Sequence, residues 1–251
     1  MLTKLIKLPF NAIGLELIRK NHVRNRIPSM PNWKERMQHA KKLGFSPKVV
    51  LDGGAFKGLW SKEVGFIFPG SQIVLVEPNP FVQDIIKGNV SHIQPPPIIL
   101  NVALGESQGN ASLNIWRDEI SDMGASLLEH VSGSPRREIQ VQIDTLDNIS
   151  LRLALRLDLI KLDLQGGELL ALRGGTKVLR DAEFAIIECG CLEAYVGRAT
   201  PRDIVDVMFD NDYCLYDIVD CHYRPYDGAM TGGDFFFVKN SSVLRSYKGW
   251  E

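Results

Sequence analysis

A glycine-rich turn and an acid that follows it are the first residues whose types and spacing suggest chemistry. The turn runs from Asp52 to Gly58 as Asp-Gly-Gly-Ala-Phe-Lys-Gly, and Glu77 lies 19 residues after its end. Small residues let the backbone approach a bound group closely, and the start of a following helix can offer amide donors to an anion. A carboxylate at about this distance suits a ribose diol, because it accepts both hydroxyl protons. The pair predicts a site for a nucleoside-containing cofactor.

Two cofactors could use this arrangement. A dinucleotide site carries the pattern G-x-G-x-x-G, in which the middle glycine makes room for the pyrophosphate. The corresponding run from Gly53 has Ala55 in the middle place, which disfavours a pyrophosphate. Asp52, directly before the small residues, suits the amino-acid end of S-adenosylmethionine, whose ammonium needs an acceptor and whose carboxylate needs amide donors. The turn therefore favours S-adenosylmethionine over a nicotinamide dinucleotide.

These residues need elements that hold them at one edge of a sheet, and the chain supplies such elements from residue 48 onward. Short runs that are apolar on both faces are typical of buried parallel strands with helices between them. The predicted strands are residues 48–54, 72–79, 97–104, 157–164 and 183–190, and the predicted helices are residues 60–68, 80–87 and 168–179. This alternation predicts an α/β fold with a doubly wound, mostly parallel sheet, in which ligands bind at the carboxyl ends of the strands.

Two pairs of segments break the alternation. Residues 111–118 and 138–146 have a period of two, which predicts strands of an antiparallel insertion. Residues 213–220 and 234–240 are strand-like and are joined by a loop rich in glycine, so a C-terminal antiparallel hairpin is expected to finish the sheet. Acceptor specificity is expected to depend on the insertion and on the hairpin loop.

The N-terminal part of the chain differs in charge from the rest. Of the 251 residues, 45% are hydrophobic and 24% are charged, which is typical of globular proteins. Residues 1–50 hold 11 Lys and Arg against 2 Asp and Glu and so carry a net charge of +9. Because the whole chain has a net charge of −1, the remaining residues carry −10. We interpret residues 1–47 as a basic, partly helical extension with a helix over residues 33–43. Such an arm favours weak contact with an anionic membrane.

The rest of the composition bears on location. No run approaches the ~18 apolar residues that a membrane span requires. The cysteines are too few for a disulfide scaffold and lack the spacing of a zinc site; they are Cys189, Cys191, Cys214 and Cys221. The four tryptophans are not interleaved with basic residues, so a nucleic-acid partner is not expected. We expect a cytoplasmic protein, peripheral to the membrane at most.

Blocks spread from residue 48 to about residue 240 resemble the FkbM-type methyltransferases. They are VLDGGAFKG, VEPNP, NVALG, the pair Ser126-Leu127, IDTLD, IKLDLQGGELLALRGG and IIECG, and they occur in the family's order. The resemblance implies that residues 48–251 form a Rossmann-like class I methyltransferase domain. It also implies S-adenosylmethionine as the cofactor and methyl transfer to a hydroxyl group, the family's acceptors being sugars in glycans, polyketides and other natural products.

The resemblance also implies a role for each matching position. The residues implied to hold the cofactor are Asp52, Gly54, Ala55 and Gly58 around its methionine end, Glu77 on the ribose, and Asn101 and Ala103 beside the adenine. Asp163 is implied to lie near the sulfonium and the acceptor. The chain departs from the family at Gln165 and Gly167, where Glu and Ala are more common, and at Phe56, where Asn is common.

A hydroxyl acceptor needs a group that takes its proton, whereas the cofactor already supplies a good leaving group. The candidates are Asp163, Glu168 and Glu188. Asp163 and Glu188 end adjacent strands if the strand order is the usual one, so the two carboxylates could converge. They would then provide a general base or, less favoured, would bind Mg²⁺ or Mn²⁺. Glu168 could instead satisfy the first turn of its own helix.

The sequence therefore predicts an S-adenosylmethionine-dependent O-methyltransferase that acts on a sugar, a glycan or a natural-product hydroxyl by direct displacement. Two alternatives remain open. One is a non-catalytic cofactor-binding or scaffold protein with the same fold, and the other, less favoured, is an NAD-dependent dehydrogenase. The sequence predicts neither the acceptor's identity nor the oligomeric state.

Overall fold

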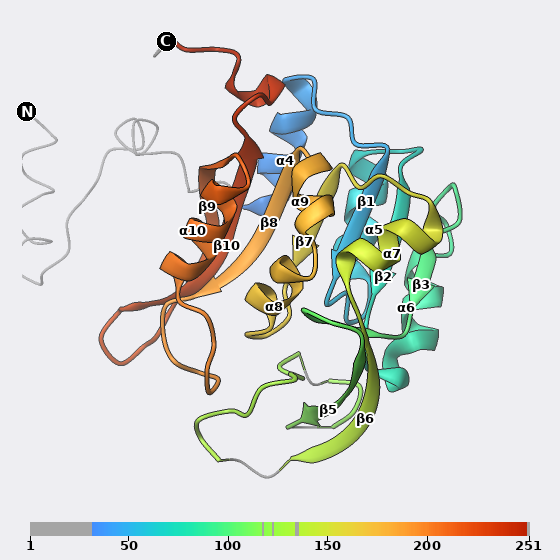
Figure 1. The fold of residues 1–251 in the computed structure, drawn as a ribbon, viewed down its shortest axis with the longest axis vertical. Coiled ribbons are helices and arrows are strands. Elements are labelled where there is room, and N and C mark those ends of the chain that lie inside the picture. The colour runs from blue at the N-terminus through green and yellow to red at the C-terminus, as the bar shows by residue number, and fades with distance from the viewer. Residues whose placement is uncertain (1–31, 117, 122, 134–135, 250–251) are drawn as a thin grey trace, which may run out of the picture. The chain divides into compact units, whose positions relative to one another are not determined.

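Seven strands form the main sheet of this computed structural model, in the order β3-β2-β1-β7-β8-β10-β9 (Figure 1). In that order the strands are Ile98–Leu100, Gln72–Val76, Val49–Gly53, Leu159–Leu162, Phe184–Gly190, Met230–Lys239 and Tyr213–Tyr223. Neighbours from β3 to β8 are parallel, and β10 is antiparallel to both β8 and β9. The predicted doubly wound sheet with a C-terminal antiparallel hairpin is confirmed.

The structure describes residues 32–249 apart from residues 117, 122, 134 and 135. The predicted extension over residues 1–47 therefore lies outside the described residues as far as residue 31. Its remaining part contains α4 (Trp33–Lys42), whose bounds are close to those of the helix predicted over residues 33–43. Helix α4 begins with a capping box between Asn32 and Glu35. Among the described residues, no helix is long and apolar enough to cross a membrane.

Helices cover both faces of the main sheet because its strands are apolar on both sides. In β1, Val50 packs into one core and Leu51 into the other. The core around Val50 is closed by α4, α5 (Leu59–Ile67) and α6 (Gln83–Val90), the last preceded by the 3₁₀ turn η1 (Pro80–Val82). The core around Leu51 is closed by α7 (Leu146–Leu153), α8 (Glu168–Arg173), α9 (Thr176–Asp181) and α10 (Pro201–Asp210). A second 3₁₀ turn, η2 (Val243–Arg245), follows β10.

A second, smaller sheet is inserted between β3 and α7. Its order is β4-β6-β5, with β4 at Ala103–Leu104, β6 at Arg137–Asp144 and β5 at Gly109–Ile115. The pairing of β5 with β6 is antiparallel, as predicted for the insertion, whereas β4 is parallel to β6. The small sheet lies beyond the carboxyl ends of the main strands (Figure 1).

The single strand predicted over residues 97–104 is wrong, because β3 and β4 belong to different sheets. The chain changes sheet at Asn101. The side-chain Nδ2 of Asn101 donates to the main-chain oxygens of Glu77 at 2.8 Å and Pro78 at 3.0 Å. These bonds hold the chain at the end of β2 while it turns into the second sheet.

The helix predicted over residues 168–179 is also divided, into α8 and α9. The break falls at Gly174 and Gly175, which lie against other parts of the chain. A Cβ atom at Gly174 would lie 2.2 Å from the main-chain oxygen of Gly105, and one at Gly175 would lie 2.7 Å from Leu146 Cδ1. This close packing anchors the helical segment beside the root of the inserted sheet.

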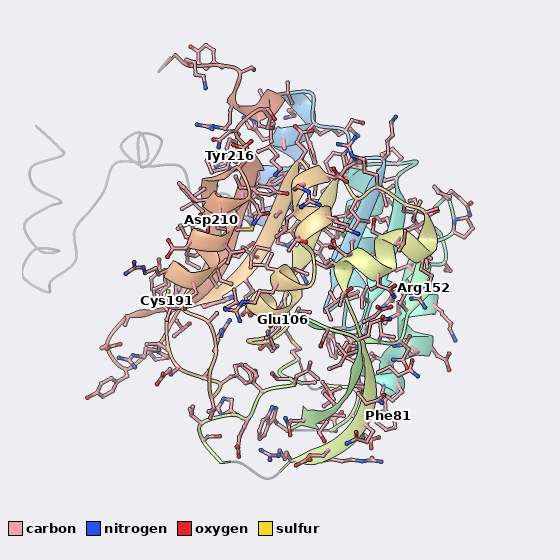
Figure 2. The ribbon with its side chains drawn as sticks, in the orientation of Figure 1. Phe81, Glu106, Arg152, Cys191, Asp210 and Tyr216 are labelled. Carbon is pink, nitrogen blue, oxygen red and sulfur yellow. The ribbon has the colours of Figure 1, made fainter. Side chains whose placement is uncertain are left out.

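The described cysteines are all free. Cys189 is buried within β8, and Cys191 is exposed directly after it, on the loop toward α10 (Figure 2). The two neighbouring cysteines therefore lie in different environments, Cys189 in the protein interior and Cys191 at the surface.

Candidate active site

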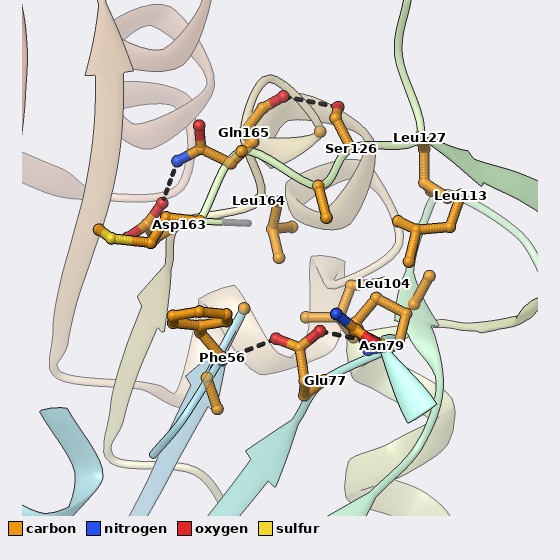
Figure 3. Close-up of a pocket in the computed structure, with 18 of the residues that line it drawn as sticks. Phe56, Glu77, Asn79, Leu104, Leu113, Ser126, Leu127, Asp163, Leu164 and Gln165 are labelled. Atoms are coloured by element: carbon orange, nitrogen blue, oxygen red, sulfur yellow. Dashed lines mark hydrogen bonds between the residues drawn. The ribbon is translucent and has the colours of Figure 1, made fainter. Parts of the chain in front are cut away.

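A pocket of about 700 Å³ lies at the carboxyl ends of β1, β2 and β7 (Figure 3). This volume is within the usual range for cofactor sites. Its lining falls into two parts. The loops after β1 and β2 and the apolar start of the inserted sheet form one part, which we call the cofactor half. The loop after β7, the described residues of the inserted loop that line the pocket, and Tyr195 form the other, which we call the acceptor half. The lining residues of the inserted loop are Trp116, Ser121, Met123, Gly124, Ala125, Ser126, Leu127, His130 and Ser132.

Glu77 is the central acid of the cofactor half. Its two carboxylate oxygens accept separate main-chain N–H groups, Oε2 from Phe56 at 2.7 Å and Oε1 from Asn79 at 2.8 Å (Figure 3). Burial raises the pKa of Glu77 to about 7, although both hydrogen bonds favour the ionised form. The carboxylate is thus fixed in position and keeps lone pairs for a ligand's hydroxyl groups.

The glycine-rich turn brings the ends of β1 and β7 together. Gly54 has φ of +74°, and a Cβ atom there would lie 1.9 Å from the main-chain oxygen of Asp163. The amides of Gly54 and Ala55 both donate to the oxygen of Val76. These amides are already used, whereas the N-terminus of α5 has no side-chain cap, so amides of its first turn are available as donors. Leu59 and Trp60 of that turn line the pocket.

Asp52 does not line the pocket but lies beneath it. It is fully buried in β1, and its Oδ2 accepts from Ser61 Oγ at 2.7 Å. Lys161 Nζ lies 3.4 Å from Asp52 Oδ1 and 3.4 Å from Asp163 Oδ2. Burial opposes the charge of Lys161, but attraction to Asp52, Asp163 and Asp234 outweighs it and raises the lysine's pKa. Asp52 therefore contacts Lys161 rather than the pocket, and Lys161 lines the pocket.

Two other residues expected beside the cofactor support the pocket from outside its lining. Gly58 is the N-cap of α5, with φ of +72°. Asn101 holds the main chain at Glu77 and Pro78, as described above. The apolar lining beyond Glu77 comes instead from Pro78, Val102, Ala103, Leu104 and Leu113. Of the predicted residues, the structure brings Gly54, Ala55, Glu77, Ala103 and Asp163 to the pocket.

The three predicted catalytic acids occupy different environments. Asp163 lines the pocket, and its Oδ1 accepts from Gln165 Nε2 at 2.8 Å. Glu168 is buried, and its Oε1 accepts from the Leu164 amide at 2.7 Å while both its oxygens accept from Gly166. Burial raises the pKa of Glu168. Glu168 therefore fixes the loop before its own helix, close to the structural role left open for it.

Glu188 lies within β8 rather than after it, and β7 and β8 are adjacent as expected. Its Oε2 accepts from Arg198 at 3.0 Å and from Gln165 Nε2 at 3.4 Å. Burial and the neighbouring charges of Asp163 and Glu168 raise its pKa to about 8. Asp234 stands opposite Glu188 on β10, and burial raises its pKa to about 7. Neither Glu188 nor Asp234 is among the lining residues.

Three aromatic side chains form a wall of the acceptor half that no sequence pattern predicted. The His130 ring lies between Trp116 and Tyr195, with ring centroids 5.5 Å and 5.3 Å away. All three residues line the pocket. Lys161 was not predicted as a site residue either, although a lysine within the apolar run of β7 indicates a buried charge that has a partner.

No group of three or more His, Cys, Asp or Glu side chains in the described part of the chain is arranged to hold a metal ion. The carboxylates nearest the pocket are instead joined to Lys161, Arg198 and Gln165.

The strand order, the antiparallel β10 and the pocket at the carboxyl ends of the strands define a class I, Rossmann-like methyltransferase fold. The Methyltransferase FkbM domain matches residues 52–216. The chain belongs to this family of methyltransferases, as the sequence resemblance predicted. A comparison with curated protein sequences found no match.

The solved structures that match this chain are distant from it in sequence. Precorrin-6y C5,15-methyltransferase from Geobacter metallireducens is 12% identical, with a TM-score of 0.45 over 82% of this chain and 86% of that one. Magnesium protoporphyrin IX methyltransferase from Synechocystis, with bound SAM, is 11% identical, with a TM-score of 0.45 over 94% and 96%. Fibrillarin from Aeropyrum pernix, with natively bound S-adenosyl-L-methionine, is 14% identical, with a TM-score of 0.45 over 81% and 74%.

Proposed function

We propose that this protein is an S-adenosylmethionine-dependent O-methyltransferase that acts on a hydroxyl of a sugar, a glycan or a natural product. The observation that carries the proposal is the Glu77 carboxylate, which lines the pocket at the tip of β2 and is fixed by two main-chain N–H groups. An acid in this place accepts hydrogen bonds from both hydroxyls of a ribose.

The other lining residues fit the remaining parts of S-adenosylmethionine. Val102, Ala103 and Leu104 offer an apolar surface for the adenine ring. The first turn of α5 offers amides for the cofactor's carboxylate, with the helix dipole in favour of the negative charge. When bound, this cofactor supplies an electrophilic methyl group and a good leaving group.

The acceptor half supplies the remaining requirements of methyl transfer to oxygen. Asp163 is the candidate acid that lines the pocket, so we assign it as the base that takes the hydroxyl proton while the oxygen forms its new bond to carbon. The wall of Trp116, His130 and Tyr195 offers ring faces and polar tips, which suit the alternating apolar and hydroxyl surfaces of a sugar. Holding both reactants in line lowers the barrier further.

Calorimetric titration with S-adenosylmethionine and S-adenosylhomocysteine tests the proposal, for the wild type and for Glu77→Ala. Losing an acceptor for both ribose hydroxyls should cost roughly 1.5–3 kcal/mol, at least about tenfold in affinity. Glu106→Ala, which removes an acid of 55% side-chain exposure, is the matched control and should bind as the wild type does. A folded wild type that binds neither ligand would overturn the proposal. Radiolabelled methyl transfer to a panel of sugars and natural-product alcohols then identifies the acceptor.

A further inference from the structure

Gln165 is the non-glycine residue in the loop between β7 and α8 that adopts a left-handed backbone conformation, with φ of +52°. Glycine takes this conformation without steric cost, and the next residue is Gly166, with φ of +103°. A glutamine held in this conformation, where glycine would be unstrained, indicates that its side chain makes contacts that glycine would lack.

The side chain of Gln165 makes contacts on three sides. Its Nε2 donates to Asp163 Oδ1 at 2.8 Å and, at 3.4 Å, to Glu188 Oε2. Its Oε1 accepts from the Tyr195 hydroxyl at 2.9 Å, while its main-chain oxygen accepts from Ser126 Oγ at 2.7 Å (Figure 3). An amide suits this place because one end always donates and the other always accepts.

Two separate segments meet Gln165 through these contacts. Ser126 belongs to the inserted loop, and Tyr195 belongs to the loop between β8 and α10. The two segments also pair with each other: His130 and Tyr195 form an antiparallel bridge, Val131 N donates to Ala194 O at 3.0 Å, and Val196 N donates to Glu129 O at 2.8 Å. Both segments of the aromatic wall are therefore joined to each other and to Gln165.

We propose that Gln165 is a positioning residue that aligns the Asp163 carboxylate with the acceptor and links this alignment to the closed aromatic wall. The assignment rests on the proposed function for the identity of the reaction. Gln165 does not exchange a proton. Its side chain orients Asp163 and accepts from Tyr195, while its main-chain oxygen, which any residue would supply, accepts from Ser126. An acid at this position would donate to Asp163 only while protonated.

The charges around Gln165 determine how an acid at this position would respond to pH. It would face Asp163, which has Lys161 on its other oxygen, and Glu188, which has Arg198 on the same oxygen and Asp234 across the sheet. The Tyr195 hydroxyl donates to it in either state. Ionisation of the introduced acid would place a third negative charge between Asp163 and Glu188. Glutamate ionises at about pH 4.3 in an unfolded chain, whereas the acids around this position oppose its ionisation in the folded protein. We therefore expect Gln165→Glu to be less stable than the wild type at pH 5.5 and less stable still at pH 8.5.

The first measurement compares melting temperatures at these two pH values for the wild type, Gln165→Glu and Gln165→Ala. Gln140→Glu is the matched control, because Gln140 is exposed and donates to Ser112 at 2.8 Å on the inserted sheet. The expected result is a deficit for Gln165→Glu that grows with pH, a deficit for Gln165→Ala at both values, and no pH-dependent deficit for the control. An equal deficit for Gln165→Glu at both values would overturn the arrangement of the amide between two acids.

The second measurement tests alignment with two ligands, sinefungin, which carries an ammonium at the position of the transferred methyl group, and S-adenosylhomocysteine, which has no charge there. For Gln165→Ala we expect sinefungin affinity to fall at least fivefold while S-adenosylhomocysteine affinity stays within twofold. Gln165→Glu at pH 5.5 should restore sinefungin binding. Equal losses for both ligands, or no loss for either, would overturn the positioning role. Failure of the wild type to bind either ligand would contradict the proposed function, and the melting series would still test Gln165.

Discussion

Glu77 lines the pocket and Glu188 lies behind its lining, next to Asp163 and Gln165, and the two acids are held in opposite ways. Burial raises the pKa of each, to about 7 for Glu77 and about 8 for Glu188. Main-chain N–H groups hold Glu77, so its geometry follows from the path of the backbone at the ends of β1 and β2. Glu188 is held by the side chains of Arg198 and Gln165, which come from other loops.

The difference teaches how one domain can keep its cofactor and change its acceptor. A contact made by the main chain survives most substitutions, because every residue except proline offers the same N–H group. A contact made by side chains is lost or altered by a single change at either partner. The position of Glu77 is thus fixed by the path of the main chain, and that of Glu188 by the identity of a few side chains.

The largest effect is expected at the point where the two halves touch. Gly54→Ala places a Cβ atom 1.9 Å from the Asp163 oxygen at a backbone φ of +74°. A left-handed alanine and an overpacked site together should cost about 3 kcal/mol or more of folding free energy. Chemical denaturation measures this cost, and cofactor binding should be lost as well.

Gly88→Ala is the matched control for that substitution. Gly88 lies in α6 with open space around its Cα atom. Alanine there should stabilise the protein by about 0.5–1 kcal/mol, because glycine is unfavourable inside a helix. Equal effects for the two substitutions would contradict the close contact between the ends of β1 and β7.

The next effect concerns pH and the acid held by the main chain. In the proposed complex a ribose donates to the ionised form of Glu77, so binding is expected to lower the acid's pKa below its value of about 7 in the free protein and to release a proton. The affinity for S-adenosylhomocysteine should therefore be constant above about pH 8 and fall by up to about tenfold per unit as the pH drops below 7.

Titration calorimetry between pH 5.5 and 8.5 checks this dependence. Glu77→Gln removes the titrating group and should give a weaker affinity that varies little over the same range. If the affinities of the wild type and Glu77→Gln changed equally with pH, the pH dependence would belong to another group. Glu77 would then not be the acid that controls cofactor binding.

The smallest effect is expected from removal of the Tyr195 hydroxyl in the acceptor half. Tyr195→Phe removes the donor to Gln165 Oε1 at 2.9 Å and to Gly124 O at 3.2 Å. We expect a loss of about 1 kcal/mol of folding free energy, with S-adenosylhomocysteine affinity unchanged. Tyr226→Phe, at a residue that is 91% exposed, should change neither quantity. A loss of ligand affinity in Tyr195→Phe would show that the two halves are not independent.

The parts of the fold that were predictable are those governed by local pattern. The buried strands and the terminal hairpin follow from runs of Val, Ile and Phe. The capped helix α10 was missed, although Thr200, Pro201 and Asp203 form a readable capping box with proline in the first turn. The split between β3 and β4 was not predictable, because it depends on Asn101 reaching two carbonyl groups at the end of another strand.

The site divides in the same way. Gly54, Ala55, Glu77 and Asp163 could be placed from short motifs, since each follows directly after a strand. The contacts of Gln165 with Ser126 and Tyr195 span 39 and 30 residues along the chain, and no local pattern indicates them. Long-range side-chain contacts of this kind form only after the loops are folded over the sheet.

The inserted sheet begins and ends at neighbouring residues. Ala103 pairs with Ile143 and Leu104 with Asp144, so the chain departs from and returns to nearly the same point. Because the two ends of the segment lie side by side, the rest of the domain does not depend on the number of residues between them. A change of length within the inserted segment can therefore leave the main sheet intact, provided that the segment keeps its pairing with residues 194–196 and its contact with Gln165.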